Sequence, residues 1–179
     1  MAKIRPAHCY RYAKRAFTRV SRYREESYVK GVPGSKIRKF DMGKTNGEFE
    51  LMIGLKSRSN MQIRHNALEA FRANANKNLE IALGKDNYHL KLKVYPHQVM
   101  RHNPTANFAG ADRFSSGMKH CWGKTLGRAA VIKKGQVFAF AKINTGSLTK
   151  AKDSLRIACH KLPCKYSFEV TPQVKTASK

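Results

Sequence analysis

The sequence predicts an α+β fold in which two helices pack on one mixed sheet. Residues 59–83 and 147–162 keep apolar side chains at helical spacing. Short apolar or alternating segments with the length of strands lie before, between and after these two helices. The chain has 179 residues, of which 41% are hydrophobic, so we expect a single domain (1–179) with a buried core.

Residues 1–35 are expected to form an extended basic segment. Residues 1–39 hold twelve Lys and Arg side chains against only Glu25 and Glu26, and tyrosines lie between the cations. The segment shows neither a helical nor a strand period, which indicates irregular chain with short turns. Aromatic side chains among guanidinium groups are suited to stacking on unpaired bases.

Two strands and the first helix follow this segment. Turns at residues 31–34 and 43–47 separate the predicted strands 36–42 and 49–55. Ser59 and Gln62 have the spacing of a capping box, and Gly84 is suited to end the helix that begins there. The inner side of this helix is rich in alanine, so we expect it to lie close to a sheet.

A strand over residues 87–94 is expected to have two chemically different faces. Its apolar side chains, Tyr88, Leu90 and Leu92, alternate with polar ones. Because side chains alternate across a strand, His89, Lys91 and Lys93 fall together on the opposite face. The sequence therefore predicts a sheet with one apolar and one cationic face.

The second half of the chain begins with a predicted long functional loop over residues 97–128. This segment is rich in glycine and has no aliphatic period, which is typical of a functional or disordered loop. A hairpin is expected over residues 128–143, with its turn at Gly135. The second helix ends before Pro163, a strand follows over residues 166–170, and the tail 171–179 is expected to fray.

Cations are spread over the N-terminal segment, several predicted strands, both helices and the central loop. Lys and Arg total 36 and Asp and Glu total 11, which gives a net charge of +25. Since no single tail carries this charge, we expect several faces of the domain to contact nucleic acid. No long apolar run and no strongly amphipathic apolar helix is present, so we expect no membrane contact and no secretory signal.

Few residues are suited to catalysis or metal binding. The carboxylates are scattered, and the cysteines (Cys9, Cys121, Cys159 and Cys164) include no Cys-x-x-Cys pair. Acid–base sites and zinc sites need such groupings, so we expect free thiols, no metal, no cofactor and no enzymatic activity. One alternative is an RNA-modifying enzyme that uses Cys121 or His120, which would need a base held nearby.

Several motifs, in order along nearly the whole chain, resemble one family. They are residues 5–12 (RPAHCYRY), 31–33 (GVP), 36–41 (KIRKFD), 84–86 (GKD), 109–113 (AGADR), 117–118 (GM) and 135–137 (GQV). Together they resemble the archaeal and eukaryotic branch of the large-subunit ribosomal protein sixteen family, whose older name is protein ten-e. Residues 161–165 (KLPCK) are also similar to the end of the bacterial counterpart.

The resemblance implies a fold, a location and a set of partners. The fold would be a hammerhead-like α/β sandwich, and the protein would be a non-enzymatic constituent of the large ribosomal subunit in the cytoplasm. It would bind large-subunit rRNA near the central protuberance, with 5S rRNA and other ribosomal proteins nearby. Its internal loop would reach toward tRNA and the peptidyl-transferase centre, and no homo-oligomer is expected.

Charge and resemblance together give two sets of expected contact residues. The first set would bind rRNA, and it consists of Lys3, Arg5, His8, Tyr10, Arg11, Tyr12, Lys14, Arg15, Arg19, Arg22, Arg24, Lys36, Arg38, Lys91 and Lys93. The second set would face tRNA, where its glycines allow close approach of the backbone, and it consists of Arg101, Gly110, Asp112, Arg113, Gly117, Lys119, Gly123 and Lys124.

Two further expectations concern the organism from which the chain comes and a second alternative function. The tail lacks the longer acidic extension of eukaryotic family members, which favours an archaeal source. A free-standing tRNA-binding or chaperone module is the other alternative, and it would be a stable, soluble monomer. The charge of +25 argues against this alternative, because self-repulsion in so small a domain favours poor solubility at low salt without a polyanion.

Overall fold

The structure is a computed structural model that describes residues 4–12, 20–23, 25–29, 31–103, 118 and 121–173. The elements of this part of the chain are η1 (Ala7–Tyr10), β1 (Asp41–Gly43), β2 (Leu51–Ser57), β3 (Met61–Arg64), α1 (His65–Leu83), β4 (Tyr88–Leu92), β5 (Gln98–His102), β6 (Lys124–Ile132), β7 (Val137–Ile143), η4 (Thr145–Ser147), α2 (Leu148–Cys159) and β8 (Tyr166–Pro172).

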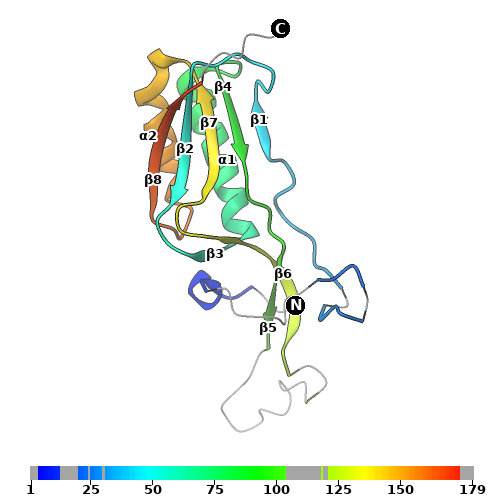
Figure 1. Cartoon of the computed structure of the whole chain (residues 1–179). Helices are drawn as coiled ribbons and strands as arrows, with labels where there is room; N and C mark the ends of the chain where they lie inside the picture. Colours follow the sequence, from blue (N-terminus) through cyan, green and yellow to red (C-terminus); the bar gives the residue numbers. More distant parts are fainter. Residues whose placement is uncertain are drawn as a thin grey trace.

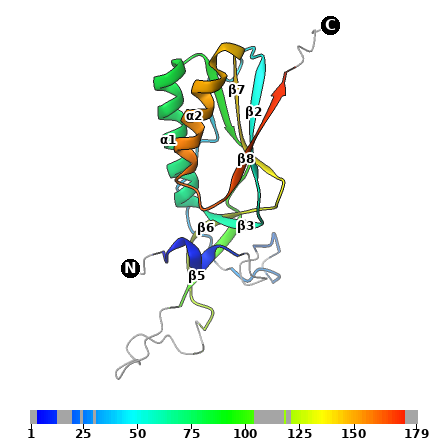
Figure 2. The ribbon, with the colours of Figure 1, turned by 90° about the vertical axis from the view of Figure 1, so that its left-hand side faces the viewer.

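The strands form two sheets, of five and three strands. The larger sheet has the order β1-β4-β7-β2-β8, and the smaller one has the order β3-β6-β5. Both helices lie on one side of the larger sheet, and the smaller sheet lies beneath it, next to the N-terminal segment (Figures 1 and 2). The predicted α+β class with two helices packed on a sheet is confirmed.

The core lies between the helices and the larger sheet. Leu90 of β4 and Ala141 of β7 are register partners, and both are completely buried. Phe71 of α1 meets Phe138 edge to face, with 6.0 Å between the ring centroids. Leu155 brings α2 into the same core. Ala139 and Ala141 of β7 belong to the same core, where their small side chains leave room for the helices.

The sheet differs from the predicted single mixed sheet. Every strand pair of the described residues is antiparallel, and the strands are divided between two sheets. The predicted hairpin 128–143 is also wrong, because β6 pairs with β3 and β5 while β7 pairs with β2 and β4. The turn at Gly135 therefore carries the chain from one sheet to the other.

The predicted start of the first helix at Ser59 is wrong as well. Residues 61–64 form β3, which pairs with β6 from Met61↔Ile132 to Arg64↔Ala129. Helix α1 begins at His65 without a side-chain cap, although Gly84 does end it. Strand pairing that buries Met61 and Ile63 outweighs the local capping signal, because tertiary burial contributes more than a cap.

The predicted long loop over residues 97–128 contains strand at both of its ends. Strand β5 occupies its beginning and β6 its end, and their register runs from Gln98↔Ala129 to His102↔Lys124. These two strands project away from the larger sheet (Figure 1). At the C-terminus, β8 extends to Pro172 as the outer partner of β2.

In the part of the chain that the structure describes, neither helix has the length and apolarity needed to cross a membrane.

Candidate nucleic-acid interface

The face of the larger sheet opposite the helices is cationic. The Tyr88 hydroxyl donates a hydrogen bond to Asn76 Oδ1 of α1 (2.8 Å), so Tyr88 points toward the helices. Strand alternation then directs His89 and Lys91 to the opposite face, as the sequence predicts. The register pairs His89 with Lys142 of β7, so Lys142 shares that face.

Two more lysines complete what we call the cationic face, which consists of Lys56, Lys91, Lys93 and Lys142. Lys93 follows β4, and its Nζ lies 5.3 Å from the ring centroid of Phe140 on β7. An ammonium group over an aromatic ring is stabilised by the negative face of the ring. Lys56 of β2 forms a salt bridge with Glu169 of β8, with 3.7 Å between Nζ and Oε2.

Asp41 of β1 interacts with two basic side chains at the β1 edge of this face. Asp41 Oδ1 accepts from Lys91 Nζ at 3.1 Å and lies 3.2 Å from His89 Nε2. His89 also packs edge to face on Phe140, with 6.0 Å between the ring centroids. Among the described residues, Lys93 and Lys142 have no carboxylate partner, so their charge is available to an anion.

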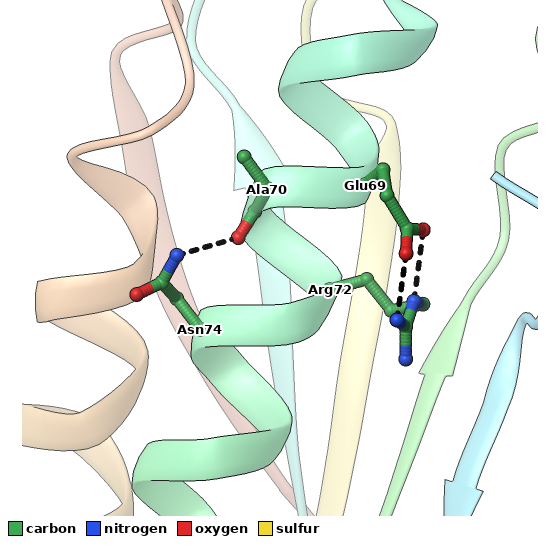
Figure 3. A network of polar contacts seen from close by, with 4 residues as sticks. All are labelled: Glu69, Ala70, Arg72 and Asn74. Atoms are coloured by element: carbon green, nitrogen blue, oxygen red, sulfur yellow. Dashed lines mark hydrogen bonds and ion pairs between the residues drawn. The ribbon is translucent and has the colours of Figure 1, made fainter. Parts of the chain in front are cut away.

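Ion pairs also form on the two helices. Arg72 and Glu69 of α1 form a two-pronged pair, with 2.7 Å between Nη2 and Oε1 and 2.9 Å between Nε and Oε2 (Figure 3). Arg156 and Asp153 pair on α2 at 3.0 Å. These pairs neutralise part of the charge on the helices, as Lys56–Glu169 and Lys91–Asp41 do on the sheet face.

Tyr10, a predicted base-stacking residue, is buried inside the protein. It packs with Met100, Ala129 and Ile4, and only 9% of its surface is exposed. Its hydroxyl donates to the carbonyl oxygen of Arg101 at 3.1 Å, and burial raises the pKa of this hydroxyl. In this structure Tyr10 anchors the N-terminal segment to β5 and presents no ring face for a base.

The remaining described residues of the segment dock through their backbone. Gln62 N–H donates to the carbonyl oxygen of Arg11 (2.7 Å), and Arg64 Nη1 donates to that of Arg5 (2.8 Å). The side chains of Arg5 and Arg11 stay exposed, as do the predicted contact residues His8, Tyr12 and Arg22. Docking by main chain therefore leaves these side chains available for a partner.

Arg101 and Gly123, predicted to face tRNA, have internal roles. The guanidinium group of half-buried Arg101 donates to the carbonyl oxygens of Tyr28 and Gly123. Gly123 is buried and has φ +83°, and an added Cβ would lie 2.5 Å from the backbone of His102 and Asn103. Its small size allows close approach of this chain's own backbone.

The other predicted contact residues fall into two groups. Lys36, Arg38, Lys93 and Lys124 are exposed, and Lys91 is half-buried. The rest lie outside the described residues, and they are Lys3, Lys14, Arg15, Arg19, Arg24, Gly110, Asp112, Arg113, Gly117 and Lys119; the same holds for His120 and for residues 174–179 of the predicted tail.

Sequence reasoning missed two contributors to these surfaces. Lys142 lies on the cationic face, and the strand pattern of residues 136–143 would have revealed it if both faces had been considered. Arg128 links β6 to the segment that precedes β1, because its Nε donates to the carbonyl oxygen of Pro33 (2.6 Å). No local sequence signal marks a contact between residues so far apart.

His65 lies where the N-terminal segment, α1 and β6 meet. Its Nδ1 accepts a hydrogen bond from the backbone N–H of Lys36 at 2.8 Å, so the proton of the neutral ring is on Nε2. Burial lowers the pKa of His65, and the charges of Lys36, Arg128 and Arg64 lower it further. The folded protein therefore holds this histidine neutral.

The free energy of unfolding should decrease on acidification because of His65. The unfolded chain binds a proton at its ordinary pKa of about 6.5, whereas the folded chain binds it only at lower pH. The stabilisation associated with neutral His65 is complete above the pKa that this residue has in the unfolded chain. It is lost as the pH falls toward the lower pKa that the residue has in the folded chain. Denaturation at about pH 7.5 and about pH 5.5, compared between wild type and His65→Gln, measures it. An identical pH dependence in both proteins would contradict it.

The cysteines divide into two exposed and two buried thiols. Cys9 and Cys121 are exposed, whereas Cys159 and Cys164 are buried. Burial raises the pKa of Cys159 to about 12 and that of Cys164 to about 11. Within the described ranges, no group of three or more His, Cys, Asp or Glu residues is arranged to hold a metal ion.

Thiol titration should therefore show two kinetic classes. We expect Cys9 and Cys121 to react with an aromatic disulfide in the native protein, because only an exposed thiolate is a good nucleophile. Cys159 and Cys164 should react at the rate of unfolding. Cys9→Ser and Cys121→Ser assign the fast class, and a fast reaction of the double variant would contradict the burial of the other pair.

The comparisons with known proteins identify the family of this chain. The model of the family "Ribosomal protein L16p/L10e" matches residues 13–169. A protein of Methanocella arvoryzae, "Large ribosomal subunit protein uL16", is 45% identical over 148 residues, which cover 83% of this chain and 86% of the relative. Proteins of the same name from Methanococcus maripaludis and Hyperthermus butylicus are 40% and 38% identical, and each alignment covers 94% of this chain and 94% and 93% of the relative. The resemblance seen in the sequence is confirmed, and this chain belongs to the ribosomal protein L16p/L10e family.

Proposed function

We propose that this chain is a structural constituent of the large ribosomal subunit in the cytoplasm, where it binds rRNA and performs no chemical reaction. Membership of the ribosomal protein family, which covers nearly the whole chain, carries this proposal. The net charge of +25 and its placement on several surfaces support it, because rRNA is the polyanion that such a surface would neutralise.

The proposed mode of binding uses two surfaces. The cationic face would contact phosphates through Lys93 and Lys142, which have no carboxylate partner in the described part of the chain. The N-terminal segment would contribute Arg5, Arg11 and Arg22, whose side chains are exposed while the segment is docked by its backbone. Contacts of this kind fix the position of RNA helices through shape and charge and carry little sequence information.

We further propose that the segment between β5 and β6 faces tRNA near the peptidyl-transferase centre. In this proposal the body of the protein lies near the central protuberance, with 5S rRNA and other ribosomal proteins nearby. The projection of β5 and β6 away from the larger sheet supports the idea, because residues 103–123 connect the far ends of these two strands (Figure 1). Lys124, exposed at the start of β6, would contact the tRNA backbone.

The ribosomal role is tested by sedimentation of a cell lysate through sucrose at moderate and high salt. Co-sedimentation with the large subunit that survives about 0.5 M salt is expected for an integral component, because non-specific phosphate binding weakens steeply with salt. A position at the top of the gradient would overturn the proposal and favour a free-standing tRNA-binding or RNA-modifying protein.

The tRNA contact is tested separately with reconstituted subunits. We expect replacement of Arg113 and Lys124 by alanine to lower tRNA affinity and the rate of peptide-bond formation. The same substitution of Lys77 and Lys150, which are exposed on the helices, is the matched control. Unchanged tRNA affinity and an unchanged rate in the Arg113 and Lys124 variant would overturn this part of the proposal and leave the rRNA-binding part intact.

A further inference from the structure

A cleft of about 330 Å³ lies between the segment that precedes β1, the residues that follow β4, and β6. The function proposed above does not account for it. Its lining is formed by Ser35, Ile37, Arg38, Phe40, Tyr95 and Arg128. Ile37 is buried and forms an apolar wall, whereas Arg38 is exposed. Pockets for small ligands have volumes of about 300 to 1,000 Å³, so the cleft has room for one small group and none for an RNA helix.

Aromatic rings form one side of the cleft. Tyr95, which follows β4, lies 5.6 Å from Phe40, which precedes β1, and 4.6 Å from His97 (centroid to centroid). The backbone supports this arrangement, because Phe40 continues the β1–β4 pairing by accepting from Leu92 N–H at 2.9 Å. Tyr95 is 42% exposed despite these contacts. Part of Tyr95 therefore remains accessible beside the cleft.

Two guanidinium groups provide the polar side. Arg128 Nη1 donates to the Tyr95 hydroxyl (3.1 Å), and its Nε donates to Pro33, so the group is held in place. A guanidinium has five N–H donors. Among the described residues, Nη2 of Arg128 has no hydrogen-bond partner, so its donors remain for an external acceptor. The buried Ser35 hydroxyl is also without a partner in that part of the chain.

Among the described residues that line the cleft there is no carboxylate, which limits the kind of ligand. A cation would meet two arginines and no counter-charge. An apolar peptide side chain would leave the free Arg128 donors unsatisfied, which is costly in a partly enclosed site. A planar π-system attached to a phosphate satisfies both sides, since it can stack on Tyr95 and accept from Arg38 and Arg128.

We propose that this cleft binds a single unpaired nucleotide of the RNA to which the protein is bound. The base stacks on Tyr95 beside Phe40, and the phosphate or a base carbonyl accepts from Arg128 and Arg38. The proposal rests on the proposed rRNA binding and adds a site for one extruded nucleotide. Binding of this nucleotide would fix the position of the protein along an RNA that it otherwise contacts through shape and charge.

The test compares large subunits that carry the full chain as wild type, Tyr95→Leu or Tyr95→Phe. Acylation of ribose 2′-hydroxyls reports the mobility of every rRNA nucleotide. We expect Tyr95→Leu to raise the reactivity of one or two adjacent nucleotides several-fold, because leucine keeps bulk but offers no ring for stacking. Tyr95→Phe should retain the protection. Ile81→Ala, at an exposed site on α1, is the control for general perturbation.

Ultraviolet cross-linking of the wild-type subunits locates the contact. An RNA adduct on the peptide with residues 95–97 supports the proposal, even if Tyr95→Leu prevents assembly. Adducts elsewhere on the chain with none on this peptide, together with an unchanged acylation pattern in Tyr95→Leu, would overturn the nucleotide site and leave rRNA binding intact. Failure of the chain to sediment with large subunits would instead overturn the proposed function.

Discussion

Replacement of Lys91, Lys93 and Lys142 by glutamate is expected to weaken rRNA binding about 100-fold. Each lysine–phosphate contact contributes about 1 kcal/mol after screening, so the loss of the contacts of exposed Lys93 and of half-buried Lys91 and Lys142 costs about 3 kcal/mol. The dependence of log K on log salt should also become shallower, by about 0.7 to 0.9 for each lost contact. Filter binding to large-subunit rRNA over a range of salt concentrations measures both quantities.

A matched control separates the position of these charges from their number. Lys77, Lys150 and Lys161 are exposed in or just after the helices, and their replacement by glutamate lowers the net charge by the same amount. If the cationic face is the interface, this control should weaken binding much less. Equal weakening by both triple variants would mean that total charge alone determines affinity, which would contradict an interface on the cationic face.

Phe71→Ala is expected to lower the free energy of unfolding by about 3 to 5 kcal/mol. Phe71 is completely buried and meets Phe138 edge to face, so the truncation removes both buried area and an aromatic pair. Domains of this size have about 5 to 15 kcal/mol in total, so much of the stability would be lost. Urea denaturation in about 0.5 M salt, which screens the self-repulsion, measures the change.

The control for this core variant lies on the same helix. Ile81 is 75% exposed, so Ile81→Ala should change the free energy of unfolding by less than about 0.5 kcal/mol. A loss below about 1 kcal/mol in Phe71→Ala would contradict tight packing between α1 and the larger sheet. Added rRNA should raise the apparent stability of the variant, because a ligand that binds only the folded state shifts the equilibrium toward it.

Local periodicity was sufficient for some of these features. Alternation along residues 88–93 predicted which side of β4 carries His89, Lys91 and Lys93, because a strand leaves each side chain only two directions. The second helix also lies within its predicted range and ends before Pro163. In both cases the information lies within a few neighbouring residues.

Other features depend on partners that are distant in the sequence. Ser59 and Gln62 resemble a helix start, yet the chain there pairs with β6, a strand that begins about sixty residues later. The Tyr10 hydroxyl bonds to the Arg101 carbonyl oxygen across 91 positions, which gives this predicted RNA contact an internal partner. A single sequence shows that such residues are basic or aromatic, but their internal partners appear only when the strands assemble.

The N-terminal segment has a consequence for the protein before it meets RNA. In the smaller sheet, β3 and β5 are the outer strands, and open strand edges invite pairing with other chains. The Arg11 carbonyl oxygen accepts a hydrogen bond from the Gln62 N–H of β3. On β5, the Tyr10 hydroxyl donates to the Arg101 carbonyl oxygen, and the Tyr28 carbonyl oxygen accepts from the Arg101 guanidinium group. The basic segment thus binds one backbone group on each outer strand, and we expect it to hinder edge-to-edge pairing of the protein before RNA is bound.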